Sequence, residues 1–131
     1  MKRPLVLLAD DFVDALEMYA EYLRFHDFGV VTAADGRAAV AAAFEHEPDI
    51  ILLDVRMPVM TGVEALLVLK ADPRFRHVPI VALTAQALPE ERDRALRAGF
   101  DAFMSKPLLP DQLIRQLTKM LGDSAAASGG T

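Results

Sequence analysis

Ile50-Ile51-Leu52-Leu53-Asp54 places four large apolar residues directly before a carboxylate. An apolar run without polar alternation is typical of a strand that is buried on both faces of a sheet. Val55-Arg56-Met57-Pro58 follows, and proline cannot donate the hydrogen bond that a central strand needs. The sequence therefore predicts that Asp54 lies where a buried strand emerges into a loop.

Three other short apolar runs also end on polar residues. They are Leu5 to Ala9 before Asp10-Asp11, Pro79 to Leu83 before Thr84, and Ala102 to Met104 before Ser105-Lys106. Gly29 to Ala33 is a weaker run, which is expected at the sheet edge, and apolar residues recur at helical spacing between the runs. The expected fold is α/β, a doubly wound five-stranded parallel sheet in the order 2-1-3-4-5 with five helices, flavodoxin-like.

Helix boundaries can be predicted from capping residues. Asp35 is a good N-cap for an alanine-rich helix, and Thr61 with Glu64 forms a capping box for the next helix. Pro89 suits the first turn of a fourth helix, and Gly99 lies just past its last residue. These boundaries agree with the segments in which apolar residues recur at helical spacing, and this agreement strengthens the assignment of each helix.

The last helix is expected to begin at Pro110 and to stop at Gly122. Residues 1–122 are then expected to form one domain, as a chain of 131 residues with 53% hydrophobic and 25% charged residues indicates. Residues 123–131 are small and polar, which is typical of a flexible tail or a truncated linker.

The charge and cysteine content exclude several classes of function. There are 14 Lys and Arg against 19 Asp and Glu, and the net charge of -5 argues against a general nucleic-acid or membrane-surface binder. The chain has no Cys, which excludes thiolate metal sites and thiol catalysis and suits a reducing compartment such as the cytoplasm. The apolar run at the N-terminus is too short for a signal peptide or a membrane span. Proteins and cations are the expected partners.

Asp10, Asp11 and Asp54 are expected to share the crevice between the first and third strands. Two carboxylates about 4 Å apart repel by about 4 kcal/mol at an effective dielectric of 20, so the cluster favours a bound cation. Oxygen ligands without Cys or His favour Mg²⁺, with Mn²⁺ as a possible substitute. Lys106 and Thr84 add a positive charge and a hydroxyl, which suits transfer of a phosphoryl group to Asp54.

Each of these residues has a plainer interpretation when it is taken alone. Asp11 could cap the first helix, Thr84 could bond to backbone, and Lys106 could be a solvated loop lysine. Their convergence at one sheet edge favours a functional site.

In this combination the chain, from about Pro4 to Leu121, resembles the chemotaxis-regulator-like receiver domains of two-component response regulators. The motifs that carry the resemblance are Asp10-Asp11, Asp54 with Met57-Pro58 and Thr61-Gly62, Thr84-Ala85, and Lys106-Pro107. The resemblance implies that Asp54 accepts a phosphoryl group from a histidine kinase or a histidine phosphotransfer protein. It also implies that Mg²⁺ is held by Asp11, Asp54 and the backbone carbonyl of Arg56, with Asp10 acting mainly through water.

The resemblance has further implications for switching. Thr84 and Phe103 would form a switch pair, with Phe103 in place of the commoner tyrosine, and Arg56 and Gln86 would tune the phosphoryl lifetime from the rim. The Lys106-Pro107 bond would be cis. The face of the fourth helix, fifth strand and fifth helix would bind a downstream target or output domain. The protein would be a cytoplasmic switch rather than an enzyme, a monomer or a phosphorylation-dependent dimer, with no direct contact to nucleic acid or membrane.

Two other classes share this fold, which alone does not separate them. A flavin-binding protein would need a loop of backbone donors after the first strand, where Asp10-Asp11 would repel the phosphate. A phosphatase with an aspartyl nucleophile would carry that residue after its first strand, whereas Asp54 follows the third. A degenerate receiver would lack one of the core residues, and none is missing here.

Overall fold

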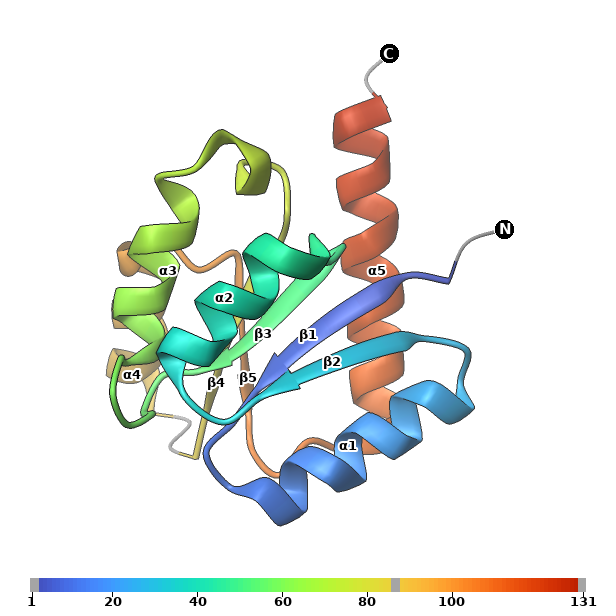
Figure 1. Ribbon diagram of the computed structural model, residues 1–131, viewed down its shortest axis with the longest axis horizontal. Helices are drawn as coiled ribbons and strands as arrows, with labels where there is room; N and C mark the ends of the chain where they lie inside the picture. The colour runs from blue at the N-terminus through green and yellow to red at the C-terminus, as the bar shows by residue number, and fades with distance from the viewer. Residues whose placement is uncertain (1–2, 86–87, 130–131) are drawn as a thin grey trace.

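The computed structural model describes residues 3–85 and 88–129, with side chains described up to residue 122. Strands and helices alternate along this part of the chain (Figure 1). The strands are β1 (Leu5–Ala9), β2 (Gly29–Ala33), β3 (Ile50–Asp54), β4 (Ile80–Thr84) and β5 (Ala102–Ser105). The helices are α1 (Val13–Phe25), α2 (Gly36–His46), α3 (Gly62–Lys70), α4 (Pro89–Ala98) and α5 (Pro110–Gly129), with a short 3-10 helix η1 (Pro73–Phe75).

All strand pairs are parallel, and the order is β2-β1-β3-β4-β5, as the sequence predicted. The register aligns the carboxyl ends of the central strands. Ala9 is opposite Leu53, and Thr84 is opposite Ser105. Residues that directly follow these positions must therefore meet at one edge of the sheet.

The sheet is covered on both faces (Figure 1). Alternate residues of each strand point to opposite sides, so Ile51 and Leu53 pack with α2, α3 and α4, whereas Ile50 and Leu52 pack with α1 and α5. Every residue of β3 is buried, which explains why this strand has no polar alternation. The central strand is thus held rigidly up to Asp54.

Most predicted helix ends are confirmed. The Asp35 side chain accepts a hydrogen bond from the Ala38 amide at 2.8 Å, and Thr61 and Glu64 form both bonds of the capping box. Gly99 has φ 121°, a conformation that glycine adopts without strain, and it ends α4. Each cap satisfies backbone groups that the helix leaves unpaired.

The prediction that Gly122 stops the last helix is wrong. Helix α5 continues through it to Gly129, so residues 123–129 are helical where a flexible tail was expected. Glycine ends a helix by adopting positive φ, and Gly122 does not do so. The helix runs on through Ala125-Ala126-Ala127. Alanine has the highest helix propensity of any residue type, so this segment favours continuation of α5. The domain boundary at residue 122 stays a prediction.

Candidate functional site

Asp10, Asp11 and Asp54 come together at the carboxyl edge of β1 and β3, as the sequence predicted. Each offers a carboxylate oxygen, and these atoms lie within 4.8 Å of one another. Asp10 is 0% exposed and Asp54 is 4% exposed, whereas Asp11 faces solvent. The cluster is therefore open on one side and buried on the other.

Backbone amides orient the two buried acids. The Phe12 amide donates to Asp10 Oδ1 at 2.9 Å, and the Arg56 amide donates to Asp54 Oδ1 at the same distance. The N-cap of α1 is Phe12 and has no side-chain cap, so Asp11 does not have the capping role that would have explained it more simply. With both Oδ1 atoms bound to backbone, the Oδ2 atoms are left to face the opposing cation.

Lys106 is that cation. Its Nζ donates to Asp54 Oδ2 at 2.6 Å and to Asp10 Oδ2 at 3.1 Å. Its backbone amide donates to the Thr84 carbonyl at 2.7 Å, which ties the lysine to the neighbouring strand. The Lys106-Pro107 peptide bond is cis, as the resemblance implied.

The charged partners alter one another's protonation. Burial raises the pKa of the Asp54 carboxyl, although hydrogen bonds from Lys106 and from the Arg56 backbone act in the opposite direction. Burial alone would lower the pKa of Lys106, but its bonds to Asp54 and Asp10 outweigh burial and raise the pKa. Lys106 is therefore firmly cationic. A further positive charge near Asp54 would stabilise the ionised form of the Asp54 carboxyl.

Thr84 and Phe103 line one cavity of about 290 Å³, whose wall also includes Val55, the residue that follows Asp54. Thr84 ends β4 and is 3% exposed, and Phe103 lies on the neighbouring strand β5. Arg56, an exposed residue, lines the same cavity, and Ala95 on α4 forms part of its wall. The implied switch pair thus shares one space. Gln86, the other implied rim residue, lies outside the described residues.

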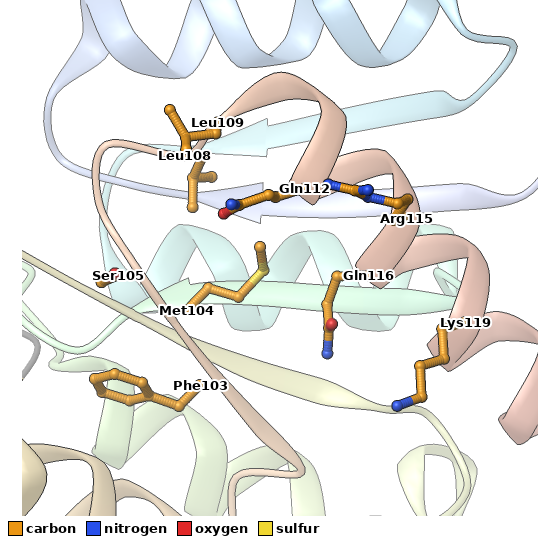
Figure 2. Close-up of a pocket in the computed structure, with 9 residues that line it drawn as sticks. All are labelled: Phe103, Met104, Ser105, Leu108, Leu109, Gln112, Arg115, Gln116 and Lys119. Carbon is orange, nitrogen blue, oxygen red and sulfur yellow. The ribbon is translucent and has the colours of Figure 1, made fainter.

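A second pocket, of about 430 Å³, lies between β5 and α5. Figure 2 shows Phe103 and Met104 on its strand side and polar side chains of α5 on its helix side. The polar residues are Gln112, Arg115, Gln116 and Lys119. These residues were not singled out from the sequence, but they recur at helical spacing opposite the buried Leu113 and Leu117, and that spacing is the signal that could have found them.

The carboxylate cluster fits a hard divalent cation. All three side chains offer oxygen ligands, and the two buried ones share a single lysine for charge compensation. Three carboxylates and one ammonium leave a net negative charge in a poorly solvated place, so a cation would stabilise the cluster. Oxygen-only ligation is the preference of Mg²⁺ and Mn²⁺ rather than of thiophilic metals.

Comparison with known proteins supports the resemblance to receiver domains that the sequence motifs indicated. The family model described as response regulator receiver domain matches residues 6–118. The chain belongs to this family. The receiver is 29% identical over 119 residues to the polar-differentiation response regulator DivK of Brucella anthropi. The aligned residues cover 91% of this chain and 97% of DivK. Receiver domains of two-component response regulators are signalling switches, so the family match favours that class over the flavin-binding and phosphatase alternatives.

Solved structures are similar to the receiver over almost its whole length. Chemotaxis response regulator CheY4 of Vibrio cholerae is 33% identical with a TM-score of 0.85, covering 90% of this chain and 98% of that one. The receiver domain of a sensor histidine kinase from Pseudomonas aeruginosa PAO1 is 35% identical with a TM-score of 0.84, covering 92% and 98%. That protein has a magnesium ion coordinated in its active site cleft. Among the residues described for the receiver, no helix is long and apolar enough to span a membrane.

Proposed function

We propose that Asp54 accepts a phosphoryl group from a histidine kinase or a histidine phosphotransfer protein. One observation carries this proposal: a buried carboxylate at the sheet edge has Lys106 on one oxygen and two further acids beside it. Structural ion pairs do not need three carboxylates, whereas a site for phosphoryl transfer needs a nucleophile and concentrated compensating charge.

In the proposed reaction an Asp54 oxygen bonds to phosphorus while the bond from phosphorus to the donor's imidazole nitrogen breaks. The released imidazole nitrogen keeps the electron pair of that bond. Lys106 then pairs with the transferred group, and the Thr84 hydroxyl can donate to one of its oxygens. The same arrangement assists the later attack of water, so the receiver takes part in its own dephosphorylation without turning over a separate substrate.

Asp10, Asp11, Asp54 and the backbone carbonyl of Arg56 are the residues that would hold Mg²⁺, with Mn²⁺ as a substitute. When bound, the cation neutralises charge on the phosphoryl oxygens. The magnesium ion in the similar P. aeruginosa receiver supports this assignment. Asp10, which is 0% exposed and engaged by Lys106 and the Phe12 amide, is suited to act mainly through a bridging water.

Phosphorylation is proposed to act on partners through Thr84 and Phe103. Phe103 lines the cavity next to Thr84, the β5–α5 pocket and a third pocket against α4 that contains Leu96. A small displacement of its ring therefore changes all three, which reshapes the face of α4, β5 and α5. This face would bind a downstream target or output domain, with the receiver as a monomer or a phosphorylation-dependent dimer in the cytoplasm. Arg56 and Gln86 would tune the lifetime of the phosphoryl group.

Incubation with acetyl phosphate and Mg²⁺ should add a single phosphoryl group, which intact-protein mass spectrometry will detect. Asp54→Asn should abolish the adduct because the amide is not nucleophilic. Asp35→Asn is the matched control: it removes a carboxylate outside the site and keeps a good N-cap, so it should be labelled as the parent is. An adduct that persists in Asp54→Asn contradicts the proposal, as does a parent chain that stays unlabelled.

Asp11→Ala should weaken Mg²⁺ binding roughly 10- to 100-fold, because it removes the exposed carboxylate of the cluster. Without Mg²⁺ this variant should be at least as stable as the parent, since a like charge has gone. Asp14→Ala removes the same charge in the first turn of α1, three residues beyond Asp11, and should bind Mg²⁺ nearly as the parent does. The chain has no Trp, so calorimetry or NMR titration is the suitable measurement. Equal affinities in the two variants would exclude Asp11 as a ligand.

A further inference from the structure

A buried hydrogen bond beneath the site joins α1 to the loop that follows Lys106. The backbone amide of Leu108 donates to the Tyr19 hydroxyl at 3.1 Å, across 89 residues of sequence. Tyr19 is 6% exposed and Leu108 is 4% exposed, and both lie in the core layer that α1 and α5 form with the sheet. An aromatic ring in that layer needs no hydroxyl for packing, so the hydroxyl has a separate role.

The loop has few other ways to fix its backbone. After Lys106 it consists of Pro107-Leu108-Leu109, and Pro110 begins α5; neither proline has an amide hydrogen. Only Leu108 and Leu109 can donate, and the donor nearer to Lys106 is bound by the Tyr19 side chain instead of by loop backbone. The position of this loop therefore depends on a side chain of α1.

The same bond connects the two oppositely charged halves of the site. Helix α1 begins two residues after Asp11, and Leu108 lies two residues after Lys106. On the strand side Lys106 is already fixed by its amide bond to the Thr84 carbonyl. Tyr19 supplies the constraint on the other side, from the helix that follows the acids.

We propose that Tyr19 is a positioning residue for phosphoryl transfer: its hydroxyl holds the β5–α5 loop so that the Lys106 ammonium reaches Asp54 and Asp10 together. This inference rests on the proposed phosphorylation of Asp54. The residue acts through Lys106 and does not touch the reacting group. A displacement of about 1 Å in a charged group at such a site can cost up to about 100-fold in rate.

Tyr19→Phe is the test, because it removes only the hydroxyl and keeps the buried ring. Labelling by acetyl phosphate at saturating Mg²⁺ should slow roughly tenfold. Tyr22→Phe makes the same change about one turn further along α1, on a half-buried ring that packs against His26, and should leave the rate unchanged. The affinity for Mg²⁺ should be unchanged in both variants, since no carboxylate has been altered.

Repeating both substitutions in a Lys106→Met background separates positioning from general destabilisation. If Tyr19 acts through Lys106, Tyr19→Phe should produce no further slowing of the residual labelling there. Equal slowing in the two backgrounds would overturn the proposal and leave Tyr19 a stability role alone. An unchanged rate with Lys106 present would overturn it as well.

An NMR readout keeps this inference distinct from the proposed function. Tyr19→Phe should shift the Lys106 Nζ resonance and speed amide exchange at Leu108, whereas Tyr22→Phe should do neither. If the parent chain is never labelled, the proposed function fails while the NMR comparison still decides whether Tyr19 positions Lys106. An unaltered Lys106 Nζ resonance in Tyr19→Phe would overturn the inference regardless of labelling.

Discussion

Lys106→Met should lower the free energy of unfolding by about 3 kcal/mol at neutral pH without Mg²⁺. Methionine keeps most of the apolar stem but leaves Asp10 and Asp54, which are 0% and 4% exposed, as buried carboxylates without their common cation. Labelling of Asp54 should slow roughly 100-fold, since the ammonium that pairs with the phosphoryl oxygens has gone. Urea denaturation and mass spectrometry measure the two effects.

The pH dependence of this loss has a definite sign. Burial already raises the pKa of Asp54 in the folded parent, and removal of Lys106 should raise it further. A carboxyl whose folded pKa exceeds its unfolded pKa destabilises the fold once it ionises, so stability is lost as pH rises through the folded value. The deficit of Lys106→Met should therefore be greatest at neutral pH and shrink in acid. Saturating Mg²⁺ should also reduce it, because a cation can replace the missing charge.

Lys70→Met is the control for this experiment. Lys70 pairs with Asp101 at 3.2 Å, but these side chains are 27% and 42% exposed, so solvent weakens the pair. Its loss should cost about 1 kcal/mol or less and should not depend on Mg²⁺. Similar losses in the two variants, or a deficit in Lys106→Met that grows in acid, would show that Lys106 does not compensate the buried acids.

The fold was predictable where local and global signals agree. The continuous apolar run before Asp54 indicated a strand buried on both faces. The N-cap Asp35 and the capping box at Thr61 located the starts of two helices. Gly122 shows the limit of such signals. Glycine permits a helix stop but does not require one, and the outcome depends on whether its φ is positive. Here the helix continues, which a single glycine in the sequence does not reveal.

The candidate site was predictable because parallel strands bring their carboxyl ends to one edge. Asp10, Asp54 and Lys106 follow from that topology alone, although the pairing of one ammonium with two Oδ2 atoms does not. Tyr19 was hidden for a different reason. An aromatic residue on the apolar stripe of a helix indicates core packing, and the partner of its hydroxyl depends on the path of a loop 89 residues away.

Gly62→Ala should be the most damaging single-methyl change at this site, because α3 begins almost against the end of β3. A Cβ at Gly62 would overlap the Asp54 carbonyl oxygen and lie 2.8 Å from the Val55 Cα. Both neighbours are backbone, so relief requires α3 or the strand end to move. We expect a loss of about 3 kcal/mol in the free energy of unfolding. Labelling should fall as well, since the displaced residue is the proposed acceptor.

Gly122→Ala is the matched control and should have the opposite sign. A Cβ there meets nothing within 4 Å, and the residue lies inside α5 without positive φ. Alanine in an exposed helix interior should therefore raise the free energy of unfolding by about 0.5 to 1 kcal/mol and leave labelling unchanged. Destabilisation by Gly122→Ala would mean that α5 does not run through this position. A parent-like rate of labelling in Gly62→Ala would mean that the close approach of α3 does not fix Asp54.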